Sequence, residues 1–286
     1  METAMWPSSA EPDGDLRVSA RTLTTPLGHR VRIIERGVGR PVVFLHSGVG
    51  SAGEWKQVWE LWPQDWRLIA VDAYRGGTGP GSAGARSLED YADQVYAVAD
   101  HVGEPVRLVG FSWGGATALR VAAAAPHLVT SLAVIEPEAY GLLRAEDADS
   151  DAHAEICRLR DRWRAHVRAG RWHEAFEEFI DFYNGAGTFA HWPLERQQAF
   201  LAVQQTRGDL WDVLFDGVAV DDLTAITAPT HVIEGSRSSA VDHAICDVVG
   251  RHVSNARREV IAGAGHMMPL THAGPLSRVL LSRITP

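Results

Sequence analysis

The chain has 286 residues, of which 45% are hydrophobic and 22% charged, a composition that excludes a disordered or fibrous protein. The formal net charge of −9, with 27 Lys and Arg against 36 Asp and Glu, argues against a nucleic-acid-binding surface or an anionic-membrane partner. Charged residues or His interrupt every apolar block before it reaches the roughly 18 residues that a membrane span needs. The two cysteines, Cys157 and Cys246, lie far apart, so we expect neither disulfides nor a metal site, no cofactor, and a cytoplasmic location.

The predicted elements begin after an acidic segment, residues 1–19, that we expect to be a flexible tail. Two β-rich segments, 16–23 and 30–35, predict an antiparallel hairpin. Short apolar strands then alternate with helices. Strands are predicted at 42–46, 68–72, 106–111, 132–136, 230–234 and 258–261, and helices at 54–61, 88–101, 113–124, 241–252 and 275–282. This order predicts an α/β fold with a doubly wound, mostly parallel sheet covered by helices on both faces.

The alternation stops between residues 141 and 222, where segments 152–168, 172–183 and 194–215 have helical spacing. We expect this segment to be a helical cap inserted after the sixth strand, with 20–140 and 223–286 forming the core. Trp192 lies beside a proline between two of the predicted helices. It is therefore the cap tryptophan that we expect to face a substrate pocket.

Residues 110–115 read GFSWGG and join a predicted strand to a predicted helix, with Ser112 at the apex of the turn. Glycines two positions to either side permit a tight, strained turn that holds the serine hydroxyl up for attack. A serine hydroxyl is a weak nucleophile until a base takes its proton. The motif therefore predicts catalysis only if the chain also supplies a base and an acid.

The predicted base is His266, in the glycine-rich loop that follows the last strand. Negative charge developing on a substrate carbonyl needs fixed donors, an oxyanion hole. The backbone N–H of Trp113, directly after the serine, is one expected donor. The loop at 45–50 should supply the other from Gly48, with Ser47 as the alternative.

From His46 through Ser112 to His266, these motifs resemble the α/β-hydrolase superfamily, and the resemblance implies an α/β-hydrolase fold with a cap. Many members of that superfamily carry their catalytic aspartate after strand seven, where this chain has Ser238. A subset takes the acid from the end of strand six, which here is Glu136. We expect Glu136 to be the acid, because a carboxylate ending a buried strand needs a partner. The alternatives are Glu138, Asp242 and Glu234.

These residues together predict a cofactor-independent serine hydrolase that cleaves a medium-sized, hydrophobic small-molecule ester or lactone. The expected substrate-binding residues are Ser47, Phe111, Met267, Met268 and Trp192. Hydrolysis of a carbon–carbon bond or a thioester, proline-iminopeptidase-like peptidase action and ligand binding without turnover remain alternatives. A homodimer is compatible with the sequence, which does not specify one.

Overall fold

The computed structural model describes residues 18–72, 87–206 and 209–284. Its sheet has eight strands in the order β1-β2-β4-β3-β5-β6-β7-β8. The strands are β1 (Val18–Thr24), β2 (Arg30–Arg36), β3 (Arg40–Leu45), β4 (Trp66–Asp72), β5 (Val106–Phe111), β6 (Val129–Ile135), β7 (Thr230–Gly235) and β8 (Ala256–Ile261). The β1–β2 and β2–β4 pairs are antiparallel and all later pairs are parallel. The predicted fold class is thus confirmed.

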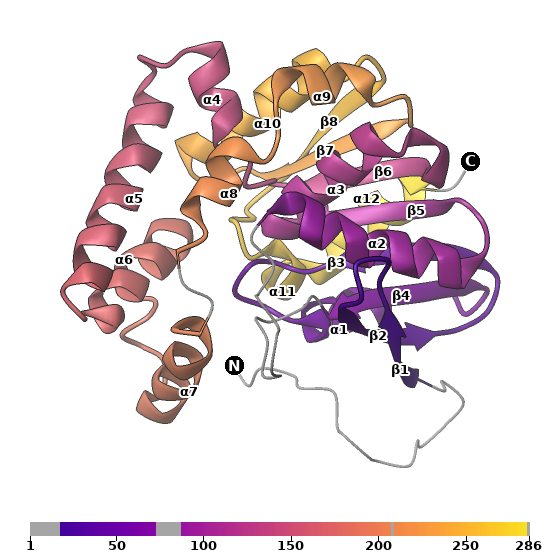
Figure 1. Ribbon diagram of the computed structural model, residues 1–286, viewed down its shortest axis with the longest axis horizontal. Helices are drawn as coiled ribbons and strands as arrows, with labels where there is room; N and C mark the ends of the chain where they lie inside the picture. Colours follow the sequence, from indigo (N-terminus) through magenta and orange to yellow (C-terminus); the bar gives the residue numbers. More distant parts are fainter. Residues whose placement is uncertain (1–17, 73–86, 207–208, 285–286) are drawn as a thin grey trace.

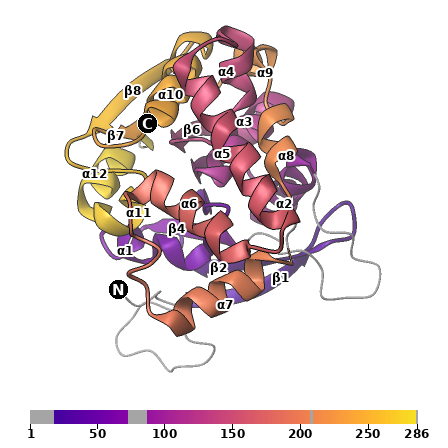
Figure 2. The same ribbon diagram turned by 90° about the vertical axis from the view of Figure 1, so that its left-hand side faces the viewer.

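Helices cover both faces of this sheet (Figures 1 and 2). One buried cluster joins it to α2 (Leu88–Val102), α3 (Trp113–Ala124), α9 (Val220–Ala225) and α10 (Ala240–His252). The other joins it to η1 (Ala52–Trp55), α1 (Lys56–Trp59), α11 (Met268–Thr271) and α12 (Ala273–Ile284). Alternate residues of a strand point to opposite faces, so Leu108 packs in the first cluster while Val109 and Phe111 pack in the second.

Between β6 and β7 the described chain is helical. It contains α4 (Gly141–Glu146), α5 (Asp151–Arg168), α6 (Trp172–Asn184), α7 (Leu194–Gln204) and α8 (Trp211–Asp216), followed by α9. Figure 1 shows α5, α6 and α7 as a separate layer beside one end of the sheet. Aromatic side chains pack this layer together: the Trp163 ring contacts Trp172, Phe176 and Trp211. We refer to α4–α8 as the cap.

Three expectations about the elements need comment. Of the expected tail, residues 1–17 lie outside the described residues, and 18–19 belong to β1. The predicted helix at 54–61 is a 3₁₀ turn, η1, continued by the short α1. The predicted helix at 194–215 is two helices, and α8 starts anew where the carboxylate of Asp209 accepts the Trp211 N–H at 3.0 Å.

Candidate active site

Ser112 lies at a strained turn between β5 and α3, with φ 57° and ψ −119°. Such a conformation costs a non-glycine residue about 1–3 kcal/mol and persists only when its surroundings hold it. The Ser112 N–H donates to the Ile135 carbonyl at 2.9 Å, and its carbonyl accepts the Glu138 N–H at 3.1 Å. A Cβ on Gly110 would lie 2.2 Å from the Gly114 carbonyl oxygen. The end of β6 and the close approach across the turn therefore hold the serine in place.

His266 brings both nitrogens of its ring into this site. Its Nε2 lies 3.2 Å from Ser112 Oγ, and its Nδ1 lies 2.8 Å from Glu136 Oε2. The two contacts assign the proton to Nδ1, which donates to the carboxylate, and leave Nε2 to accept from the serine hydroxyl. Ser112 is 3% exposed and His266 4%. The three side chains that the sequence proposed as nucleophile, base and acid thus form one buried chain of hydrogen bonds.

Glu136 leaves β6 with a positive φ of 41°. Its N–H still donates to Ile233 of β7, at 3.1 Å. Its Oε1 accepts the Gly235 N–H at 2.7 Å and also a hydrogen bond from the Ser238 hydroxyl. Ser238, at the position where the sequence lacks an aspartate, therefore helps to hold the Glu136 carboxylate in place.

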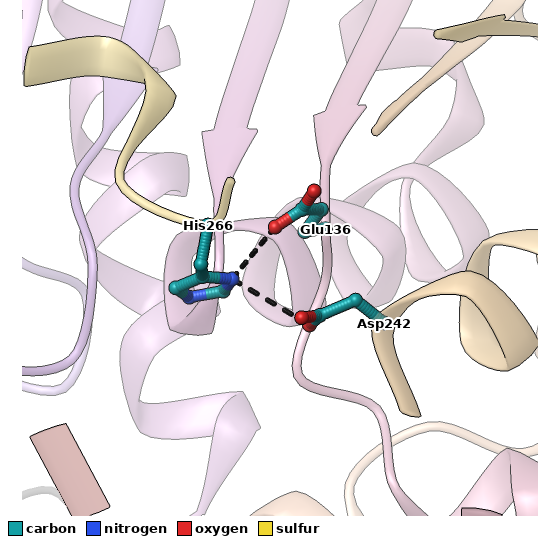
Figure 3. Close-up of side chains that lie close together, drawn as sticks. All are labelled: Glu136, Asp242 and His266. Atoms are coloured by element: carbon teal, nitrogen blue, oxygen red, sulfur yellow. Dashed lines mark hydrogen bonds and ion pairs between the residues drawn. The ribbon is translucent and has the colours of Figure 1, made fainter. Parts of the chain in front are cut away.

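A second carboxylate faces the same imidazole nitrogen (Figure 3). Asp242 Oδ1 lies 3.5 Å from His266 Nδ1, and the side chain is buried. Glu136, Asp242 and His266 offer ligand-type atoms within 4.8 Å of one another. A divalent cation could lie there only after Nδ1 had lost its proton. With the proton present, Nδ1–H faces two carboxylates.

The charge around His266 sets its protonation. Burial alone lowers the pKa of an imidazole, but the charge and hydrogen-bonding capacity of Asp242, followed by those of Glu136, outweigh it. The pKa of His266 therefore lies well above its ordinary value. The two carboxylates thus stabilise the protonated form of the ring relative to that of an isolated histidine.

A polar cluster that the sequence did not reveal lies beside the imidazole. The Tyr183 ring, from cap helix α6, lies over the His266 ring with 4.3 Å between centroids. Its hydroxyl is hydrogen-bonded to that of Tyr140, which in turn donates to Glu138 Oε1 at 3.0 Å. Burial raises the pKa of Glu138, against the opposing charge of His266. Glu138, the first alternative for the acid, thus faces the two tyrosines.

The residues expected to form an oxyanion hole lie next to each other. A Cβ added to Gly48 would lie 3.3 Å from the Cβ of Trp113, so the loop after β3 packs against the first residue of α3. Ser47 is engaged elsewhere: its N–H and hydroxyl donate to Glu54 at 2.9 and 2.6 Å. The structure therefore does not offer the donors of Ser47 to a substrate or an oxyanion.

Several residues expected to line a pocket have other surroundings. Phe111 and Met268 are fully buried on the α12 face of the sheet, so neither presents surface to a ligand. Phe111 instead packs against the imidazole of His266, with ring centroids 5.0 Å apart. Met267 keeps partial exposure. Trp192 packs within the cap, 5.1 Å from the Phe189 ring. Its position in a loop beside a proline predicted that it faces a substrate pocket, whereas its half-buried ring packs against the rings of Phe189 and Phe200.

A surface hollow of about 640 Å³ lies at the opposite end of the sheet from Ser112, around His231, Arg257 and Arg283. These residues belong to the starts of β7 and β8 and to the end of α12. Because Ser112 and Glu136 follow the carboxyl ends of β5 and β6, this hollow is not the site of the buried hydrogen-bond chain.

Among the described residues, no helix combines the length and apolarity needed to cross a bilayer.

Comparison with known proteins agrees with this architecture. The esterase EaEST from Exiguobacterium antarcticum superposes with a TM-score of 0.72 at 20% identity, covering 93% of this chain and 99% of that one. Est816, described as an N-acyl homoserine lactone degrading enzyme, superposes with a TM-score of 0.69 at 21% identity, covering 92% and 99%. At these identities the likeness shows the fold alone.

In sequence, the chain is 31% identical over 104 residues to the dihydrolipoyllysine-residue acetyltransferase component of the acetoin cleaving system of Pseudomonas putida. That stretch is 36% of this chain and 28% of the relative, so the match spans less than a third of the relative's length. The family model described as the alpha/beta hydrolase family matches residues 42–279. This match extends from β3 to α12 and includes every residue of the buried hydrogen-bond chain. The chain therefore belongs to the alpha/beta hydrolase family.

Proposed function

We propose that this family member is a serine hydrolase that cleaves a carboxylic ester or lactone through an acyl-enzyme. The observation that carries the proposal is the continuous contact from Ser112 Oγ through both nitrogens of His266 to Glu136. A nucleophile, a base and an orienting carboxylate in this order constitute the triad arrangement.

In the proposed reaction, Ser112 Oγ attacks the substrate carbonyl carbon and its proton passes to His266 Nε2. Glu136 accepts the Nδ1–H and stabilises the imidazolium that forms. The backbone N–H groups of Trp113 and Gly48 are proposed to receive the oxyanion. The imidazolium then gives its proton to the leaving alkoxide, and water, deprotonated by the same base, releases the acid and restores the serine.

The proposed substrate class follows from the type of nucleophile and from the residues that surround it. The nucleophile is a serine, so the covalent intermediate is an acyl ester, which an ester, lactone or thioester carbonyl can form. The aromatic cap residue Tyr183 lies over the imidazole, which favours an apolar substrate. The names of the structural neighbours, an esterase and a lactone-degrading enzyme, support the same class.

The alternative of a peptidase that recognises a free amine would need unpaired carboxylates in the cap. On α6, Glu178 pairs with Arg162 at 2.9 Å. Asp181 accepts the N–H groups of Gly187 and Phe189. These two carboxylates are engaged within the cap, so neither is offered to the free amine of a peptide, which supports an ester or lactone as the substrate.

The test is hydrolysis of p-nitrophenyl butyrate and of simple aliphatic lactones by the wild type beside Ser112→Ala, His266→Gln and Glu136→Gln. The first two variants should lose several orders of magnitude in kcat, and Glu136→Gln somewhat less. Labelling of Ser112 by a fluorophosphonate, read by mass spectrometry, reports the activated serine independently of substrate choice. A Ser112→Ala protein that hydrolyses the ester normally would refute the assignment. Tight ligand binding by a wild type that neither reacts with the probe nor turns over would favour a receptor.

A further inference from the structure

Two carboxylates converge on one nitrogen of His266, although a triad requires only one. Glu136 Oε2 lies 2.8 Å from Nδ1 and Asp242 Oδ1 lies 3.5 Å from it (Figure 3). Glu136 is 0% exposed and Asp242 2%. They come from different elements, the end of β6 and the first turn of α10. The convergence is therefore a product of the tertiary fold rather than of local sequence.

Each carboxylate is anchored through the oxygen that does not face the imidazole. Glu136 Oε1 accepts from Gly235 and Ser238, as described above. Asp242 Oδ2 accepts from the Ser239 N–H at 3.2 Å and from the Ser239 hydroxyl at 2.8 Å. The Asp242 N–H in turn donates to Ser239 Oγ at 3.1 Å, which completes the capping box of α10. The helix cap thus fixes Asp242 with its other oxygen, Oδ1, directed at Nδ1.

The burial of Asp242 is hard to explain by its capping role alone. A capping carboxylate can lie at the surface, as that of Asp222 on α9 does in part. A buried carboxylate is costly unless a positive charge compensates it. Within the described part of the chain, the ion pair formed by Asp242 is with His266. Its charge is offset when that ring is protonated.

We propose that Asp242 is a second positioning carboxylate, which shares with Glu136 the stabilisation of the His266 imidazolium formed during the reaction. This inference rests on the proposed function. Glu136 takes the hydrogen bond, since its oxygen is nearer, and Asp242 acts through its charge. The other groups that face the ring are Ser112 on Nε2 and, from the polar cluster, Glu138 and Tyr183.

Two carboxylates around one imidazole have a consequence for the pH dependence of catalysis. The base must be neutral to take the serine proton, so the rate rises with pH through the pKa of His266 in the free enzyme. Two negative charges raise that pKa and displace the rising limb toward alkaline pH. Removing either charge should move the limb back toward the ordinary histidine range.

The experiment measures the pKa of His266 by NMR on the full-length protein, with the imidazole assigned by its absence in His266→Gln. Asp242→Asn keeps a side-chain oxygen for the capping box and removes the charge. We expect it to lower the pKa of His266 by about one to three units. Asp247→Asn, on the same helix but paired with Arg251 and Arg258, is the matched control and should leave that pKa unchanged.

A second readout is the rate of Ser112 labelling by a fluorophosphonate across pH in Glu136→Gln and in the Glu136→Gln, Asp242→Asn double variant. The double variant should react about tenfold or more slowly than Glu136→Gln, because the remaining carboxylate is lost. An unchanged pKa in Asp242→Asn, or equal rates in the two proteins, would overturn the proposal.

Two arrangements keep these results interpretable. Should Asp242→Asn fail to fold, the chemical shift of the Asp242 carboxyl carbon is measured across pH in the wild type instead. We expect this resonance to change together with the titration of His266, and a change independent of His266 would overturn the proposal. The NMR titration needs no turnover. A wild type that is not labelled at Ser112 would therefore refute the proposed function, whereas the pKa comparison tests Asp242 alone.

Discussion

Replacement of Ser238 by alanine tests whether the residue at the more common acid position now supports Glu136. The substitution removes the hydroxyl that donates to Glu136 Oε1 and leaves that oxygen the Gly235 N–H at 2.7 Å. A hydrogen bond to a charged group contributes about 1.5–3 kcal/mol. Ser238 is only half-buried, so water can replace part of this contribution. We therefore expect the free energy of unfolding to fall by about 1.5 kcal/mol, the lower end of that range.

At about 2–4 °C per kcal/mol, this loss should lower Tm by about 3–6 °C. Looser positioning of Glu136 should also lower kcat/KM for p-nitrophenyl butyrate by up to about tenfold, since 1.4 kcal/mol is a factor of ten. The control is Ser236→Ala, which removes a neighbouring hydroxyl that accepts the Gly263 N–H at 2.8 Å and that, among the described residues, forms no hydrogen bond with Glu136. Equal Tm and kcat/KM values in the two variants would refute a supporting role for Ser238.

Three further outcomes are expected. Burial holds the pKa of Glu138 above its ordinary value, so the folded protein retains that proton to higher pH than the unfolded chain does. The contribution of Glu138 to stability therefore falls as pH rises. Urea unfolding at pH 5 and pH 8 should show Glu138→Gln gaining stability relative to wild type at the higher pH. The raised pKa of His266 contributes stability that is fully present below about pH 6.5 and is lost as pH rises through the pKa of the folded state. The difference in unfolding free energy between wild type and His266→Gln should therefore shrink from pH 6 to pH 10. A constant difference would contradict the pairing of His266 with the carboxylates. Gly110→Ala places a Cβ 2.2 Å from the Gly114 carbonyl oxygen and should lower the unfolding free energy by about 1–3 kcal/mol or more, measured by thermal unfolding, whereas Gly103→Ala meets no atom within 4 Å and tests only its positive φ.

The elements of the core could be predicted because their signals are local. Apolar runs of strand length alternate with helical patterns, and this order alone specifies a parallel sheet with helices on both faces. The turn at Ser112 could also be predicted, because the glycines two positions to either side of the serine are required by the steric crowding of the turn itself. Because Ser238 has no carboxylate, the sequence predicts Glu136 as the acid, and the structure places Glu136 Oε2 2.8 Å from the imidazole Nδ1.

The cap was less predictable in detail. The spacing over 194–215 is helical throughout, but the structure has two helices there, α7 ending at Gln204 and α8 beginning at Trp211. The surroundings of the expected pocket residues could not be predicted from the sequence either. Phe111 and Met268 are fully buried because strand alternation and helix packing turn them toward the α12 face, while Trp192 packs against Phe189 inside the cap.

By itself, the sequence determined the order of strands and helices, the strained turn at Ser112 and the residue types available for catalysis, because each depends on neighbours within a few positions. The tertiary structure decided which of these residues meet. His266 lies 154 residues from Ser112 and 130 from Glu136 along the chain. They touch because β5, β6, β7 and β8, which precede these residues or lie between them in the sheet, are adjacent and parallel and so end at the same edge. The same adjacency places Asp242 at Nδ1, and only the folding of the cap over the sheet lays Tyr183 on the imidazole. Contacts of this kind depend on strand order and helix packing, which no local pattern records.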